Sequence, residues 1–356
     1  MLNRQRLGQL TGLLKEHRWD ILVLYGHTWR KDFFRCLVNV NFSGPHAAAV
    51  LDQSGEIRVL VADSWDAELI SACGVDASTY SDLGRDLSRL VSGKVAIAGL
   101  ELMERQFVPA ANGAAESATF ALEELRRVKT PEEIASIQKA ADLADRGYRH
   151  FAETAGRGMA EYELVAEVET FLKAHGAEDN FQLIASGGTE VTGMKPPTAR
   201  RFREGDSITT ELTPQVDGYW AQICRTLVMG EPSAGQRKSF AIFSEAQKAA
   251  EDFLRPGVNI ADVARVQNDV FRKHGYGEYT GPKYTRVRGH GLGLHCDENP
   301  WILEDVNYTV KEGMVLIAHP NTYLPLAGYM VFGDSLLVTA NSSTPLNHTE
   351  RKLFQK

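Results

Sequence analysis

A pattern of two helices followed by strands occurs twice in this chain, with the copies about 105 residues apart, and it limits the folds that the chain can adopt. The first copy begins at Thr130-Pro-Glu-Glu133, which supplies an N-cap, a proline at the first helical position and a glutamate at the third. We therefore expect an α/β (α+β) domain whose two halves are related by a pseudo-twofold axis. Four helices are predicted: one that begins at residue 131, and three that cover 162–174, 236–254 and 261–274. The predicted strands are 206–213, 219–228, 314–319 and 335–339.

The first third of the chain has its own α/β pattern. Leucines at helical spacing between residues 7 and 14 predict a helix, and short apolar runs predict strands at 21–25 and 94–100 and a hairpin at 47–51 and 57–62. An Ala/Gly/Ser-rich stretch at 109–119 indicates the approach to a domain boundary. We expect two domains, residues 1–121 and 122–356.

Composition excludes several classes of protein. The chain has 356 residues, of which 43% are hydrophobic and 24% are charged, as in ordinary globular proteins. Its net charge is −7 and it has no long Lys/Arg run, so we expect no nucleic-acid partner. No apolar run has the length of a signal core or a membrane span, which predicts a cytoplasmic protein without a membrane partner. Four cysteines without a CxxC motif indicate neither a disulfide framework nor a zinc ribbon: Cys36, Cys73, Cys224 and Cys296.

From about Leu122 to Leu346 the chain resembles the pita-bread family of methionine aminopeptidase, aminopeptidase P, prolidase and creatinase. Each motif is weak alone, and the specific signal is their shared order and spacing. Residues 1–121 resemble the smaller N-terminal domain of the creatinase and prolidase branch. The resemblance implies a pita-bread catalytic domain at 122–356 and a homodimer. The motifs lie at 127–134 (RVKTPEEI), 205–206, 218–219, 225–226, 254–258, 289–293 (GHGLG), 311–314 and 337–339.

Peptidases of this family bind two divalent metal ions through two Asp, one His and two Glu, and a water activated by the metals attacks the amide. The resemblance implies that this ligand set is rewritten here, because Gln and Gly cannot bridge two cations. The dinuclear site is therefore expected to be absent. The five positions correspond, in chain order, to Glu211, Gln222, His290, His319 and Gly333.

The same resemblance implies that helper histidines are replaced by Met194 and Asp297. The histidine missing at Met194 is the catalytic base of creatinase, the metal-free hydrolase of the family. Its guanidinium-binding carboxylates correspond to Cys224 and Gly333, so creatine is a poor candidate substrate. A shift of one residue in this alignment would instead place Asp334 in the pocket.

Two hypotheses for the pocket remain open at this point. Glu211, His290 and His319 could bind one Zn, Fe or Mn ion, since two imidazoles and a carboxylate are a common ligand set. Alternatively, His290 or His319 acts as a general base without metal, with Glu211 as its partner. Further residues could bind substrate, although each also has an ordinary structural explanation: Gln222, Cys224, Asp297, Glu298, His295 and Lys195.

The predicted function is hydrolysis, or a related lytic cleavage, of a C–N bond in a small polar molecule. His290 and His319 would serve as base or ligands, with Glu211 as partner. One alternative is an Xaa-Pro-type metallopeptidase, which requires a metal pair. Another is a catalytically inactive pita-bread scaffold used for binding. Polar and protonatable replacements in the pocket favour an enzyme over a scaffold.

Overall fold

A computed structural model describes residues 2–110 and 114–356 of the chain. The chain divides into two compact units between residues 126 and 127, whereas the sequence places the boundary between 121 and 122. Within the stretch 109–119, predicted to lead to that boundary, residues 111–113 lie outside the described residues. None of the helices in 2–110 and 114–356 combines the length and apolar character needed to cross a membrane.

The first unit is built on a six-stranded sheet in the order β4-β3-β2-β1-β5-β6. The predicted helix, the strands near 21–25 and 94–100 and the hairpin are confirmed with small differences in their ends. The sequence did not predict the short strands β4 and β6 or the helices α3 and α4. The elements are α1 Arg4–His17, β1 Ile21–His27, α2 Asp32–Arg35, β2 His46–Asp52, β3 Ile57–Val61, α3 Ser64–Ser71, β4 Asp76–Thr79, α4 Leu83–Leu90, β5 Val95–Ala98, η1 Leu100–Leu102, η2 Arg105–Phe107, β6 Glu116–Ser117 and α5 Thr119–Arg127.

The second unit contains a nine-stranded sheet with the main order β11-β12-β15-β10-β8-β7 and a small β13-β14 sheet. Strands β16, β17 and β9 pair with β15, β10 and β8 at the margins of the main order. The elements are α6 Pro131–Thr154, α7 Glu161–Ala174, β7 Asp179–Gly187, β8 Ser207–Val216, β9 Tyr219–Trp220, β10 Ile223–Val228, α8 Ala234–Phe253, α9 Ile260–Lys273, η3 Gly277–Thr280, β11 Gly289–Gly291, β12 Val315–Ala318, β13 Thr322–Leu324, β14 Gly328–Met330, β15 Gly333–Val338, β16 Ser343–Pro345 and β17 Phe354–Gln355.

The repeated layout is confirmed, since α6 and α7 precede β7–β10 and α8 and α9 precede β11–β15. Thr130 and Glu133 form the predicted capping box, in which each side chain accepts the backbone N–H of the other residue. Ser233 and Gln236 form the equivalent box at the start of α8. Both helix pairs therefore begin with the same local signal.

Two differences from the expected strands have local causes. The strand predicted at 219–228 is interrupted at Ala221 and Gln222, because the Gln222 N–H donates to the Ser335 hydroxyl instead of to a strand partner. Strand β7 was missed because its first residues, Asp-Asn-Phe-Gln, are mostly polar. It is nevertheless paired with β8 along its whole length.

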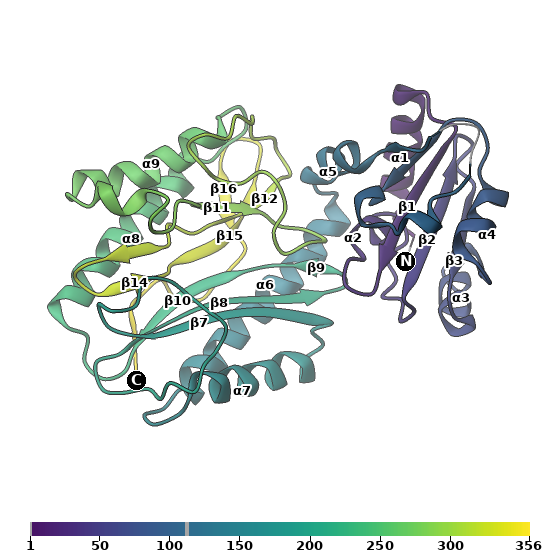
Figure 1. The fold of residues 1–356 in the computed structure, drawn as a ribbon. Coiled ribbons are helices and arrows are strands. Elements are labelled where there is room, and N and C mark those ends of the chain that lie inside the picture. The colour runs from purple at the N-terminus through teal and green to yellow at the C-terminus, as the bar shows by residue number, and fades with distance from the viewer. Residues whose placement is uncertain (1, 111–113) are drawn as a thin grey trace. The chain divides into compact units, whose positions relative to one another are not determined.

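The helices cover one face of the main sheet. In Figure 1, α6 and α7 lie along the part of the sheet that contains β7, β8 and β10 and pack against it. Helices α8 and α9 lie along the part that contains β12 and β15. Leu212 and Ile223 belong to the first of these cores, and Ala318 and Leu336 belong to the second. Because side chains alternate along a strand, the residues between these core positions point to the opposite face.

Asp334 lies on the helix-covered face, directly opposite Ile223 of β10 and Ala318 of β12. Its carboxylate accepts from Arg225 Nη2 at 2.6 Å and from Arg351 Nε at 2.9 Å, and the Asp334 and Arg225 side chains are fully buried. The alternative alignment that places Asp334 in the pocket is therefore wrong, and Gly333 occupies that position.

Asp334→Asn should lower the free energy of unfolding by about 3–5 kcal/mol, because it leaves the buried Arg225 guanidinium without its carboxylate partner. Asp252→Asn breaks an exposed pair with Lys248 and should change it by less than about 1 kcal/mol. Urea denaturation of both variants and wild type measures the difference. Equal small losses in both variants would contradict this account.

Candidate active site

The register of the antiparallel strands brings distant residues together on the face away from the helices. Glu211 of β8 lies opposite Cys224 of β10, and Cys224 lies opposite Gly333 of β15. Because Ala318 pairs with Asp334, the next residue along, His319, lies beside Gly333. A Cβ atom on Gly333 would be 2.7 Å from the His319 Cβ and 2.4 Å from the Ala318 oxygen. Position 333 therefore has no room for a side chain while His319 is in place.

His290 joins this face from β11, where it pairs with Ile317 of β12. Its ring centroid is 5.4 Å from that of His319 and 5.4 Å from Trp301. His290 Nδ1 is 3.0 Å from the Gly291 oxygen, and Nε2 is 3.1 Å from an Asp297 carboxylate oxygen. The structure thus places the two predicted histidines side by side, with Asp297 in contact with one of them.

Burial keeps both histidines neutral. Desolvation lowers the pKa of His290, and the nearby Asp297 carboxylate opposes this shift. The pKa of His319 is lowered well below its ordinary value, first by burial and then by the adjacent His290. His319 Nδ1 is buried and has no hydrogen-bond partner among the described residues. An imidazole in this state can accept a proton from a bound molecule.

Glu211 shows the opposite shift. Burial and the Asp297 charge raise its pKa to about 7, and a 2.6 Å hydrogen bond from Asn321 Nδ2 partly offsets the increase. Burial and the Glu211 charge also raise the pKa of the Cys224 thiol, which accepts a 3.4 Å hydrogen bond from Gln222 Nε2. At neutral pH the thiol is protonated and a poor nucleophile, whereas Glu211 can hold or release a proton.

The residues present do not fit a pair of divalent metal ions. Of the five expected ligand positions, only Glu211 carries a carboxylate, and Gln222 Nε2 is used to donate to Cys224. The Asp334 carboxylate is bound to arginines on the other face. In the described ranges 2–110 and 114–356, no three His, Cys, Asp or Glu side chains are grouped as metal ligands. The mononuclear set of Glu211, His290 and His319 stays a prediction.

The remaining predicted binding residues are less central. Glu298 is buried, and its carboxylate accepts from Lys129 Nζ at 2.8 Å, which favours a structural role. His295 Nδ1 accepts from the Asp297 backbone N–H, and the His295 side chain is half-buried. Lys195 is exposed and bonds to Ile184 through its backbone.

Four residues of the site were missed by the sequence analysis. Asn321 bonds to Glu211, Trp301 contacts His290, and Tyr329 packs against Cys224. Arg288 donates to the Asn321 backbone oxygen. Arg288 and Asn321 are each two residues from a predicted histidine, and this spacing was the available signal.

Comparison with known proteins identifies the class. Residues 135–340 match metallopeptidase family M24, and this protein belongs to that family. The Xaa-Pro dipeptidase of Pyrococcus furiosus is 33% identical over 235 residues, which are 65% of this chain and 66% of that protein. The Xaa-Pro dipeptidase of Lactobacillus helveticus is 28% identical over 65% of this chain and 63% of its own. These alignments span slightly less than two thirds of the relatives' length.

Solved structures agree with the fold. The prolidase from Pyrococcus furiosus superposes with a TM-score of 0.80 and 25% identity, over 96% of this chain and 99% of that chain. The X-Pro aminopeptidase from Thermotoga maritima gives a TM-score of 0.86 at 20% identity, over 98% and 99%. The predicted pita-bread fold is confirmed. The relatives' names support the Xaa-Pro alternative better than creatinase-like chemistry.

Gly333→Ala should lower the free energy of unfolding by about 1–3 kcal/mol, because the new methyl group overlaps the Ala318 oxygen and His319. Gly193→Ala is the matched control, since a Cβ atom there has no neighbour within 4 Å. Thermal or urea unfolding of both variants tests the packing. A stable Gly333→Ala protein would show that His319 is not confined as described.

Glu211→Gln should change how stability depends on pH. A carboxyl group whose pKa rises from 4.5 to about 7 on folding stabilises the native state at low pH and loses that contribution as pH rises through 7. The variant should therefore gain about 2–3 kcal/mol relative to wild type between pH 5 and pH 8. Urea denaturation at several pH values measures this difference.

The matched control is Glu132→Gln, an exposed position on α6. It should stay within about 0.5 kcal/mol of wild type at each pH. A difference between Glu211→Gln and wild type that does not vary with pH would contradict the burial of Glu211 as an ionisable group.

Proposed function

We propose that this protein is a hydrolase of C–N bonds in small amide substrates, and that the Xaa-Pro peptide bond is the substrate class to test first. One observation carries the proposal, namely that the strand register gathers half-buried Glu211 and buried His290 and His319 on one face of the sheet. Membership of a peptidase family and the names of the relatives support the substrate class.

Amide hydrolysis requires that a water lose a proton and that the leaving nitrogen gain one. Neutral His319, with its unpartnered Nδ1, can accept the proton from water. Glu211, with a pKa of about 7, can deliver a proton to the leaving nitrogen. Asp297 beside His290 would stabilise a positive charge on that imidazole. These roles need no metal ion, which agrees with a donor set containing one carboxylate.

A metal-dependent Xaa-Pro dipeptidase is the second candidate. Its support is the naming of the relatives as Xaa-Pro dipeptidases at 28–33% identity. It requires ligands beyond those that the described residues group together. Metal dependence of turnover therefore separates the two candidates.

The decisive experiment is an assay of the full chain, purified without a histidine tag, against a panel of Xaa-Pro dipeptides and other small amides. Each assay is run after chelation and with added Mn²⁺, Co²⁺ or Zn²⁺, and metal content is measured by mass spectrometry. We expect turnover without added metal, reduced about 100-fold or more in Glu211→Gln and His319→Ala. His348→Ala, at an exposed histidine, should match wild type.

Turnover only with bound metal would establish the second candidate and overturn the metal-free proposal. Failure to cleave any substrate in the panel, with and without metal, would overturn the hydrolase proposal and favour the scaffold.

A further inference from the structure

Three hydrogen bonds connect Asn321 to residues of the site and its surroundings. Its Nδ2 donates to Glu211 Oε1 at 2.6 Å, and its Oδ1 accepts from the Phe332 N–H at 3.2 Å. Its backbone oxygen accepts from Arg288 Nη1 at 2.9 Å. The Asn321 side chain is buried, so these contacts leave the amide little freedom to rotate. The Glu211 carboxylate is in turn held in one direction.

Arg288 is a buried arginine two residues before His290. It is fully buried, and none of the hydrogen-bond acceptors around it is a carboxylate. Burial lowers its pKa to about 10, and Nη2 has no partner among the described residues. Burying a guanidinium without a counter-charge is unfavourable. A buried arginine in this state indicates a role beyond filling space.

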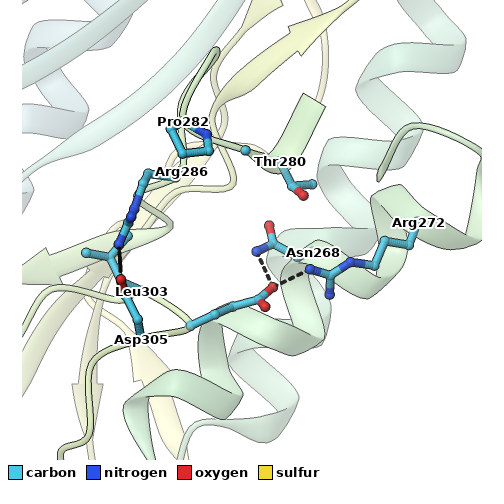
Figure 2. A pocket seen from close by; sticks show the side chains of 9 residues that line it. Asn268, Arg272, Thr280, Pro282, Arg286, Leu303 and Asp305 are labelled. Atoms are coloured by element: carbon cyan, nitrogen blue, oxygen red, sulfur yellow. Dashed lines mark hydrogen bonds and ion pairs between the residues drawn. The ribbon is translucent and has the colours of Figure 1, made fainter. Parts of the chain in front are cut away.

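The chain of hydrogen bonds continues outward from Arg288. Arg288 Nε donates to Asn268 Oδ1 at 2.5 Å, and Asn268 Nδ2 donates to Glu304 Oε1 at 2.6 Å. Asn268 and Arg272 both donate to Glu304 Oε1 at the wall of a surface pocket of about 320 Å³. Figure 2 shows Asn268 and Arg272 at this outer end. A continuous series of contacts therefore links the surface to Glu211.

The pocket itself does not contain the predicted catalytic residues. It is lined by α9, the segment 280–286 and the segment 303–305, and its arginines are paired with its own carboxylates. Its Glu304 carboxylate anchors Asn268. The anchored Asn268 fixes the orientation of the Arg288 guanidinium.

We propose that Asn321 is a positioning residue for Glu211 and that Arg288, oriented by Asn268, holds Asn321 in place. This inference rests on the proposed function, because it assigns Glu211 a chemical role. It differs from a purely structural explanation, in which Asn321 serves only to satisfy the Phe332 N–H. Misplacing a catalytic group by about 1 Å can reduce rate about 100-fold, so support of this kind has kinetic consequences.

The test compares Asn321→Ala with a matched control, Asn347→Ala. Asn347 is also buried, its Oδ1 accepts a backbone N–H from β15 at Ser335, and its Nδ2 contacts the carboxylate of Asp145 instead of Glu211. Asn321→Ala should reduce kcat about 10- to 100-fold with KM within about 2-fold. Asn347→Ala should lower the thermal midpoint by a similar amount and leave kcat within about 2-fold.

Arg288 variants test the next link. Arg288→Lys keeps a cation that can donate to the Asn321 oxygen and should retain more turnover than Arg288→Met. Asn268→Ala should show a smaller kcat loss than Asn321→Ala, since it acts through one more contact. Equal kcat values for Asn321→Ala and wild type would overturn the proposal.

A crystal structure of Asn321→Ala separates failure of this inference from failure of the proposed function. If wild type cleaves no substrate, the structure still decides the point. The Glu211 carboxylate should occupy a different rotamer, or several, in the variant. An unchanged Glu211 rotamer would overturn the positioning role whatever the activity.

Discussion

The buried ion pair between Arg225 and Asp334 holds the centre of the main sheet together directly behind the site. Arg225 also donates to the backbone oxygens of Cys224 and Gly333, the two residues that face each other across β10 and β15. One guanidinium therefore fixes the register of two strands at the row that carries Glu211. A slip of one residue would turn this row toward the helices and bring Asp334 into the site. The arrangement of the face that carries Glu211, His290 and His319 depends on this contact.

Burial determines the chemical character of that face. Removing water disfavours the charged form of each group, so the pKa of Glu211 rises while those of His290 and His319 fall. The shifts reverse the usual order of the groups, because the pKa of Glu211 rises to about 7 while the pKa values of both histidines fall below 6.5. At neutral pH Glu211 can therefore supply a proton, while the neutral imidazoles have a lone pair that can accept one. The same residues in water would be an ionised carboxylate and partly protonated imidazoles.

This protein belongs to a metallopeptidase family, yet only one of its five expected ligand positions, Glu211, carries a carboxylate. The fold is shared with prolidases over nearly the whole chain, so the strands that present metal ligands in such enzymes are expected here too. The resemblance implies that the side chains at those positions differ here. At one of them, Gly333, an added Cβ atom would lie 2.7 Å from the His319 Cβ, so His319 leaves no room for a side chain. A fold can be retained while the chemistry on it changes, because the helix-covered core and the opposite face of the sheet involve alternate residues.

Part of the fold and of the candidate site could be predicted from local sequence. The box at Thr130 and Glu133, the order of helices and strands, the pita-bread resemblance and the candidacy of His290 and His319 follow from patterns a few residues long or from motif order. Strand β7 and the contact between Asn321 and Glu211 could not be predicted in this way. The strand begins with polar residues, and the asparagine matters only because Glu211, 110 positions away in sequence, lies beside it.

The sequence by itself determined the helix starts, the repeated layout and the residue types available for chemistry, because these depend on neighbours along the chain. Only the tertiary structure decided that Gly333 rather than Asp334 faces the site, that Glu298 is bound to Lys129, and that Arg288 supports Asn321. Each of these depends on strand register or on contacts between distant segments. Such contacts form only when the whole sheet closes, and no local pattern encodes them.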